Sequence, residues 1–301
     1  MRSCTQCRAL LNDEEGPCRY CGATLGPRTR DENPYEAPAS SAFGPTLPSE
    51  VLVVEPTWTG KAGQALVITA RNLPLLTLVT WTIGLPLVLA VILATESVAE
   101  ERRFEMALQV QSLFQGIFGP IATAATIWVL AQSAAGRPAG YAEAMSVGLR
   151  CWGRLWSSLF LAGMVILLGL LMLVVPGIIH ALRLALVAPV VVLEGAGPTE
   201  ARARSRRLMR RREWAFLGTR ALLFLLALSG QVLIAGLPLP EGPVRMLVGG
   251  LWAEVLAIPL IVSGFLYYQE ARETESAVPG LDWDDDPTAA MTTKSGPEVG
   301  P

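Results

Sequence analysis

The stretch LPLLTLVTWTIGLPLVLAVILA, residues 73–94, contains no charged side chain. About 20 consecutive apolar residues are enough for a helix to cross the roughly 30 Å hydrocarbon core of a bilayer. A surface helix of a soluble protein instead carries polar residues along one face. The stretch therefore predicts a transmembrane helix and excludes a purely soluble protein.

Five more apolar segments follow, at residues 113–135, 155–175, 178–193, 214–237 and 244–268. The dipeptide Pro176-Gly177 predicts a tight turn between two of them. The segment at 178–193 is short for a crossing, so it is also compatible with a buried or tilted helix. Because 51% of all residues are hydrophobic and only 17% are charged, we expect an all-α polytopic membrane bundle of six transmembrane helices over residues 61–271.

The distribution of arginine predicts the orientation of this bundle, because cytoplasmic loops carry an excess of Lys and Arg. The more basic loops hold Arg137, Arg150, Arg154, Arg202, Arg204, Arg206, Arg207, Arg210, Arg211 and Arg212, and the opposite loops hold Arg102, Arg103 and Arg245. We therefore expect a multi-pass protein of the cell (inner) membrane with both termini in the cytoplasm.

Three similar octads precede alternate spans: QALVITAR at 64–71, EAMSVGLR at 143–150 and EARARSRR at 200–207. In each octad an alanine follows an amide or carboxylate residue, and an arginine comes six residues after that alanine. The pattern predicts cytoplasmic amphipathic helices, each leading into an apolar helical hairpin, in a three-fold repeat.

Four cysteines near the amino terminus form two C-x2-C pairs, Cys4 with Cys7 and Cys18 with Cys21. Four thiolates at this spacing suit a tetrahedral Zn²⁺ ion, and the metal supplies the core that so short a segment lacks. Two disulfides in an exported domain are one alternative, but the start MRSCTQC has no apolar signal-peptide segment. A redox CxxC motif, which usually occurs singly beside a βαβ unit, is another. We expect a zinc ribbon with structural Zn²⁺ over residues 1–26, and packing as the role of Cys151.

Two polar segments flank the membrane region. Residues 27–60 are rich in Pro, Ser, Gly and acidic residues, a composition typical of a flexible linker. Residues 272–301 include four aspartates around Trp283 and predict an acidic, disordered tail.

The stretch PGIIHALRLALVAPVVVLEGAGPTEARARSRRLMRRREW, residues 176–214, resembles part of the six-span membrane domain attached to some bacterial glycerophosphodiester phosphodiesterases. The matching positions are Pro176, Gly177, Arg183, Pro189, Glu194, Gly195, Ala201, Ser205 and Leu208. The resemblance implies a membrane domain over about residues 61–270 without implying an activity for it. The catalytic barrel of those enzymes is missing, and a single histidine, His180, is present. We therefore expect a non-enzymatic protein.

Several ionisable residues lie within or at the ends of the apolar segments. Such groups are costly at membrane depth, and they usually pair or face a watery cavity. His180, Arg183 and Glu194 share one face if residues 178–193 form a single helix. We expect Arg183 to lie beside Glu254, and Arg220 beside Glu194. These residues serve either helix packing or a path for a substrate or ion.

The segment TEARARSRRLMRRR, residues 199–212, predicts an interfacial helix begun by Gly197 and Pro198. Arginines surround a narrow apolar strip, an arrangement that binds anionic lipid head groups. Fixing the orientation in the membrane is the alternative role of these arginines. The expected head-group ligands are Arg202, Arg206, Arg207, Arg210 and Arg211. Nucleic acid is not expected as a partner beside the bilayer, and the net charge of the chain is −2.

Two classes of function fit these features best. One is a membrane scaffold that displays the zinc ribbon to a cytoplasmic protein partner. The other is a transporter or lipid-handling channel that uses Arg183 and Glu254. An intramembrane enzyme would have only His180 and carboxylates for its chemistry, and the sequence has no P-loop, esterase elbow or HExxH motif.

Overall fold

The computed structural model describes residues 2–3, 10–11, 53–96, 98–238, 240 and 242–277, and the chain divides into two units, Met1–Ala39 and Ser40–Pro301. In the first unit, strands β1 (Arg2–Ser3) and β2 (Leu10–Leu11) pair in antiparallel fashion. Cys4, Cys7, Cys18 and Cys21 lie outside the described residues. The zinc ribbon therefore stays a prediction.

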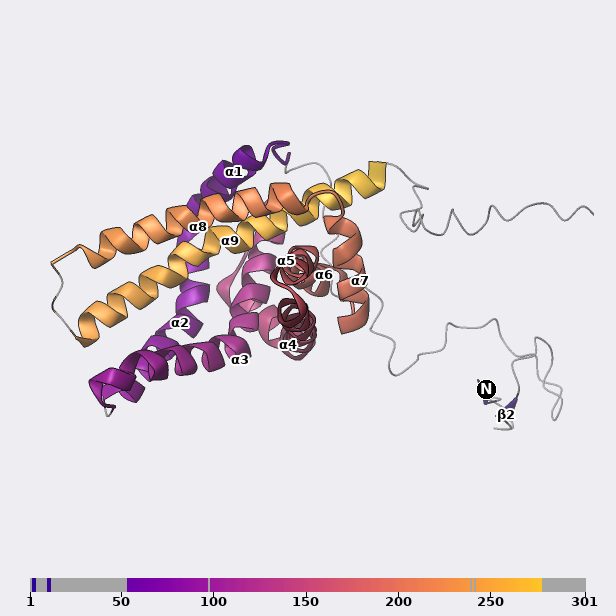
Figure 1. Cartoon of the computed structure of the whole chain (residues 1–301). Helices are drawn as coiled ribbons and strands as arrows, with labels where there is room; N and C mark the ends of the chain where they lie inside the picture. Colours follow the sequence, from indigo (N-terminus) through magenta and orange to yellow (C-terminus); the bar gives the residue numbers. More distant parts are fainter. Residues whose placement is uncertain are drawn as a thin grey trace, which may run out of the picture. The chain divides into compact units, whose positions relative to one another are not determined.

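Over its described part, the second unit consists of helices (Figure 1). They are α1 (Trp58–Arg71), α2 (Leu73–Glu96), α3 (Glu100–Ala134), α4 (Tyr141–Met172), α5 (Val174–Arg183), α6 (Val187–Glu194), α7 (Pro198–Met209), α8 (Glu213–Ala235) and α9 (Pro243–Ala277). Helices α2, α3 and α9 run through Pro86, Pro120 and Pro259 without ending.

Among the described residues, six segments are long and apolar enough to cross a membrane by length and composition, which is compatible with a multi-pass helical membrane protein. They are Leu73–Thr95, Glu100–Ala134, Tyr141–Met172, Val174–Glu194, Glu213–Ala235 and Pro243–Glu275.

Buried side chains concentrate at one end of the unit, where α1, α6 and α7 meet the adjoining parts of α3, α4, α8 and α9. Ile127, Leu155, Leu186, Met209 and Tyr267 are among the most completely buried residues there. By contrast, the far parts of α4 and α8 expose many large apolar side chains, among them Leu171 and Leu233. Packing between helices thus stabilises one end of the unit, and the apolar surface of the rest is available to lipid.

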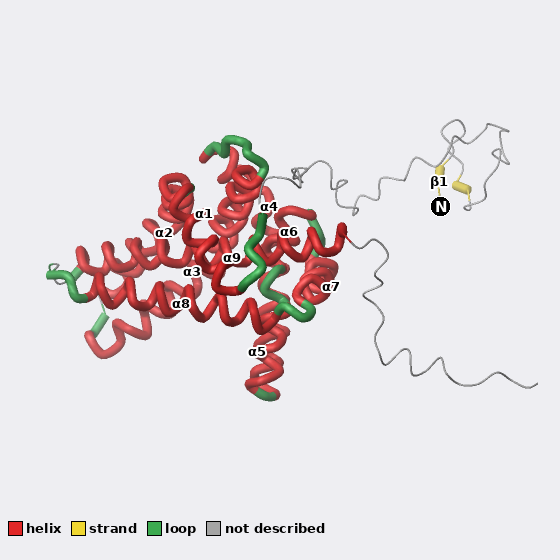
Figure 2. Tube along the Cα trace, turned by 90° about the horizontal axis from the view of Figure 1, so that it is seen from above, coloured by secondary structure: helices red, strands yellow, loops and turns green. Residues whose placement is uncertain are grey.

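The helical hairpins run in different directions. In Figure 1, α8 and α9 lie side by side across the view, whereas α4, α5 and α6 are seen down their axes. Turned by 90° about the horizontal axis in Figure 2, α8 and α9 still run across, and α5 projects away from them. The hairpin of α4 and α5 therefore crosses that of α8 and α9 instead of running parallel to it.

The three octads share one pattern of buried and exposed residues. Ala65 in α1, Ala144 in α4 and Ala201 in α7 are all fully buried. The arginines six residues later, Arg71, Arg150 and Arg207, are all exposed. The first and third octads lie in separate helices, α1 and α7, whereas the second is continuous with its hairpin because α4 does not break after it.

The predicted turn at Pro176-Gly177 is wrong. The chain turns at Leu173, whose backbone is extended, and Pro176 and Gly177 lie in the first turn of α5. Proline is tolerated there because the first backbone N–H groups of a helix have no intrahelical partner. Gly177 serves close packing, since its Cα would lie 3.0 Å from a Cβ atom on Gly169 of α4.

Two predicted boundaries also need correction. Residues 53–57, expected in the linker, are fastened to α1: the side-chain amide of Gln64 donates to the carbonyl oxygen of Val53 (2.8 Å), and its oxygen accepts from the N–H of Glu55 (3.1 Å). At the other end, α9 continues to Ala277, six residues into the expected tail that begins at 272. Both segments contribute to the packed end of the unit.

Candidate functional site

Charged side chains from four helices and from the residue before α8 meet at the packed end of the unit. They form what we call the charge network: Lys61 of α1, Glu194 of α6, Arg204 of α7, Arg212 before α8, and Glu270 and Glu275 of α9.

Glu270 joins α9 to α1 and to the start of α8. Lys61 is only 2% exposed, and its Nζ lies 3.0 Å from Oε1 of Glu270. The same ammonium donates to the carbonyl oxygen of Pro56 (3.2 Å) and lies 4.8 Å from the centre of the Tyr267 ring. Arg212 Nε lies 3.7 Å from the other carboxylate oxygen of Glu270. This buried lysine is thus held by a carboxylate, a carbonyl and an aromatic face.

Arg204 joins α7 to α6 and α9. Its two terminal nitrogens each donate to one carboxylate oxygen of Glu275 at 2.5 Å, and its Nε donates to Glu194 at 3.2 Å. The Tyr268 hydroxyl donates to the second oxygen of Glu194 (2.9 Å). Hydrogen bonding to Glu275 is the main cause that raises the pKa of Arg204 above its ordinary value, so the guanidinium stays charged.

Ser205 fastens the break between α5 and α6 to α7. Its buried hydroxyl donates to the carbonyl oxygen of Arg183 (2.9 Å) and accepts from the N–H of Leu186 (3.1 Å). Helix ends leave such backbone groups unpaired, and a buried unpaired group is destabilising. One hydroxyl therefore satisfies two backbone groups at the break between the two helices.

The arginines of α7 and the residues after it divide between two sides. Ala201, Leu208 and Met209, which make up the apolar strip of this helix, are buried in the protein core. Arg206, Arg207, Arg210 and Arg211 are exposed, whereas Arg202 is half-buried and donates to the carbonyl oxygen of Pro198 at 3.2 Å. Arg211 has a positive φ of 69°, which turns the chain sharply between α7 and α8.

Glu254 of α9 reaches into the interior between α2 and α3. The side-chain amide of Gln115 donates to its carboxylate at 2.6 Å. On α2, a Cβ atom at Gly84 would lie 2.9 Å from Cγ of Glu254, so the missing side chain makes room for the acid. A polar side chain among apolar helices thus has one amide partner and the space left by one glycine.

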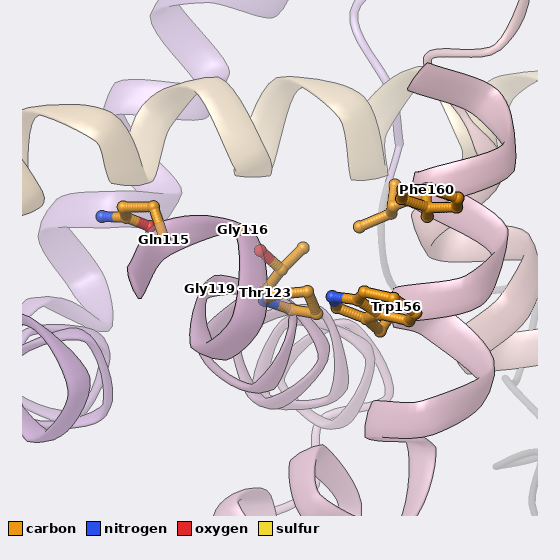
Figure 3. A pocket seen from close by; sticks show the side chains of 8 residues that line it. Gln115, Gly116, Gly119, Thr123, Trp156 and Phe160 are labelled. Carbon is orange, nitrogen blue, oxygen red and sulfur yellow. The ribbon is translucent and has the colours of Figure 1, made fainter. Parts of the chain in front are cut away.

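A cavity of about 340 Å³ lies beside this pair, between α3 and α4. Figure 3 shows Trp156 projecting from α4 toward α3, with Gln115, Gly116, Gly119 and Thr123 along the facing helix. Phe160 stacks on Trp156, with ring centres 5.3 Å apart. The lining is mostly apolar, with polar side-chain groups on Gln115, Thr123 and Trp156.

Arg220 lies in α8, and among the described residues no carboxylate forms an ion pair with it. Its guanidinium carbon is 4.8 Å from the centre of the Phe216 ring, and its Nε has no hydrogen-bond acceptor among the described residues. A Cβ atom on Gly264 of α9 would lie 3.1 Å from one terminal nitrogen, so this glycine admits the guanidinium. An aromatic face provides the contact that we expected from Glu194.

Both predicted intramembrane pairs are therefore wrong. Arg183 lies 3.3 Å from Glu213, at the start of α8, and Glu254 is bound by Gln115. Glu194 binds Arg204 and Tyr268. The physical reason is the break at Leu184–Leu186, which ends α5 and begins α6, so residues 178–193 do not form one straight helix with a common depth scale.

The same break interrupts the predicted polar stripe. His180 and Arg183 belong to α5, but Glu194 ends α6. His180 Nδ1 lies 2.7 Å from the carbonyl oxygen of Pro176, one turn earlier in its own helix. These three residues therefore do not form a continuous path.

Lys61, Glu270 and Glu275 were not predicted as site residues, and Ser205 had no predicted contact. Spacing carried a signal only for Ser205, which comes four residues after the octad alanine. The equivalent positions in the other octads, Thr69 and Gly148, are buried as well. No local sequence pattern could have paired Lys61 with Glu270, because the two residues lie in the first and the last of the described helices.

Comparisons of the chain with protein-family models, curated proteins and solved structures find no match. The resemblance to the membrane domain of the phosphodiesterases therefore stays a prediction.

Proposed function

We propose that this protein is an integral membrane scaffold that displays a cytoplasmic zinc ribbon to a protein partner and binds anionic lipid head groups through α7. The observation that supports the lipid contact is the division of arginines around α7. Arg204 is turned inward to carboxylates, while Arg206, Arg207, Arg210 and Arg211 are exposed opposite a buried apolar strip. The apolar strip packs against the protein, and the exposed arginines on the other side can attract anionic head groups.

The lipid contact is tested by charge removal on α7. Each cation near an anionic surface contributes about 1 kcal/mol, so R206Q/R207Q should weaken binding of phosphatidylglycerol by roughly thirtyfold. Native mass spectrometry of the purified protein in detergent measures the bound lipid directly. R102Q/R103Q, a pair of exposed arginines at the start of α3, is the matched control. Equal lipid retention by both double variants would contradict the lipid part of the proposal.

The ribbon contact is tested by a pull-down from membranes in which the full chain is compared with a variant lacking residues 1–26. A partner that remains bound to the shortened chain would contradict display by the ribbon. The structure places no residue of this segment beyond β1 and β2, so the partner-binding proposal rests on the cysteine spacing in the sequence.

A transporter or lipid-handling channel is the second candidate. Separation of Arg183 from Glu254 removes the path first considered, but Gln115 both binds Glu254 and lines the cavity between α3 and α4. Lipid scrambling and solute uptake in proteoliposomes, measured with wild type and E254Q, test this candidate. Equal background rates in both would exclude a transport role for Glu254.

A further inference from the structure

The last residue of α5 and the first residue of α8 lie at the same depth along the bundle, as two contacts show. The Ser205 hydroxyl bonds the backbone of Arg183 and of Leu186 at 2.9 and 3.1 Å. A serine side chain is short, so the end of α5 lies directly against α7, the basic helix. Arg183 Nε also lies 3.3 Å from Glu213, the first residue of α8. Two contacts thus fix α5 at the basic end of the unit.

From that level α5 is too short to cross a bilayer. Its 10 residues rise about 15 Å, half of the roughly 30 Å of hydrocarbon. Helix α8 starts at the same level, and its 23 residues rise about 35 Å. The α8–α9 hairpin can therefore reach the opposite surface, whereas the turn between α4 and α5 cannot.

The directions of the two hairpins agree with this difference in reach. Figures 1 and 2 show that α4 and α5 run across α8 and α9. Two crossed hairpins cannot both lie along the membrane normal. The longer hairpin is the one suited to span.

The end of the α4–α5 hairpin, residues 167–178, is apolar on every side; we call it the hairpin tip. Its most exposed side chains are Leu168, Leu171, Met172, Leu173, Val174 and Val175, each between 64% and 79% exposed. No Asp, Glu, Lys or Arg occurs between Arg154 and Arg183. The other two hairpins carry charges near their turns: Glu100–Arg103 begin α3, and Arg245 of α9 donates to the carbonyl oxygen of Ala235 at the end of α8.

The turn itself leaves few backbone groups unpaired, as hydrocarbon requires. It consists of Leu173 alone, whose N–H donates to Gly169 (3.0 Å) and whose carbonyl oxygen accepts from Gly177 (3.3 Å). Pro176, in the first turn of α5, has no N–H to satisfy.

We propose that the α4–α5 hairpin is re-entrant: it enters the bilayer from the side of α7, and its tip lies among lipid acyl chains without reaching the far surface. Lipid fits better than a protein partner because the exposed side chains surround the tip, and one partner face would cover only part of them. The chain then crosses four times, through α2, α3, α8 and α9. The number of crossings stays even, so both termini remain on the same side.

Cysteine accessibility in the full chain tests the proposal. Leu173→Cys reports on the tip, Ala99→Cys and Pro240→Cys on the α2–α3 and α8–α9 turns, and Pro138→Cys on the loop between α3 and α4. Each variant is treated with a membrane-impermeant maleimide in intact cells, in inverted vesicles and in detergent. Peptide mass spectrometry locates the label, so the native cysteines do not interfere.

We expect A99C and P240C to be labelled in intact cells, P138C in inverted vesicles, and L173C only after detergent is added. Labelling of L173C from outside at the rate of A99C would show a full crossing and overturn the proposal. Labelling from the inner side at the rate of P138C would place the tip in water, and a disulfide-linked L173C dimer would assign it to a second copy; both also overturn it. Met172→Cys, on the same tip, repeats the measurement if L173C does not fold.

Discussion

Arg183 and Glu213 lie 3.3 Å apart, Nε to Oε1, although 29 positions of the chain separate them and Arg183 ends an apolar helix. The arginine side chain is 51% exposed and that of the glutamate 16% exposed. An ion pair this open contributes little to stability by itself. Its importance is positional, because it brings the end of α5 to the start of α8 and so sets how far the α4–α5 hairpin can extend.

Ser205→Ala should destabilise the protein by about 1–3 kcal/mol, because it leaves a buried N–H at Leu186 and a carbonyl at Arg183 without their partner. The free energy of unfolding, measured by SDS titration in mixed micelles, checks this. Ser229→Ala is the control, since that hydroxyl is exposed and bonds only its own helix. Equal losses in both variants would mean that the Ser205 bridge adds nothing.

The sequence predicted the helices well because hydrophobicity along the chain is a local property. All six apolar segments coincide with described helices or pairs of helices, and α7 begins at Pro198 after Gly197 as expected. The octads also predicted helices with one buried face, and their alanines do lie on such a face. Helical periodicity determines which positions share a face, so this too is a local property of the sequence.

The partners of the charged residues could not be predicted in the same way. The apolar residues 178–193 were compatible with a membrane crossing and with a buried or tilted helix. Their second half, α6, is apolar because α3, α4, α7 and α9 surround it. A local pattern does not distinguish burial in protein from burial in lipid. Glu275 was assigned to a solvated tail for a similar reason: its bidentate partner Arg204 lies 71 residues away.

Arg204→Lys should lower the free energy of unfolding by about 2 kcal/mol, because an ammonium cannot reproduce the bidentate bond to Glu275 together with the bond to Glu194. Folding raises the pKa of Arg204, so its contribution to the free energy of unfolding is fully present at every pH below the ordinary pKa of arginine. The contribution is lost only as the pH rises through the pKa of the folded state. The difference from wild type should therefore persist from pH 7 to pH 10. Arg207→Lys, at an exposed position, should behave as wild type at both pH values.

Cys18→Ser should abolish zinc binding while the helical unit still inserts, because a four-thiolate site loses its geometry with one ligand and the described helices α1–α9 pack against one another. Metal analysis of the purified variant measures zinc per chain. Cys151→Ser is the matched control, since this buried cysteine lies in α4 and should leave the zinc content unchanged. A full equivalent of zinc in C18S would contradict the assignment of all four cysteines.

Reporter fusions after residue 60 and after residue 275 should give the same cytoplasmic response, and a fusion at Ala99 the opposite one. The expectation follows from the excess of arginine in the loops on one side. It holds whether α4 and α5 cross fully or re-enter, because either arrangement adds an even number of passages. Opposite responses from the two terminal fusions would exclude both arrangements.

Gly84→Ala should destabilise the protein by about 1–3 kcal/mol, and most of that loss should disappear when Glu254 is also replaced by alanine. The added methyl group would lie 2.9 Å from Cγ of Glu254, closer than packed carbons approach, so the acid would have to move away from Gln115. With Glu254 replaced by alanine, the contacts to Cγ and Cδ disappear, and the remaining Cβ atom lies at an ordinary van der Waals distance of 3.7 Å. A double-mutant cycle measured by SDS titration gives the coupling free energy, which we expect to be about 1–2 kcal/mol. Gly63→Ala, where a Cβ atom would meet nothing within 4 Å, controls for the general effect of replacing a helical glycine. Additive effects of G84A and E254A would show that Gly84 is not what admits the acid between α2 and α3.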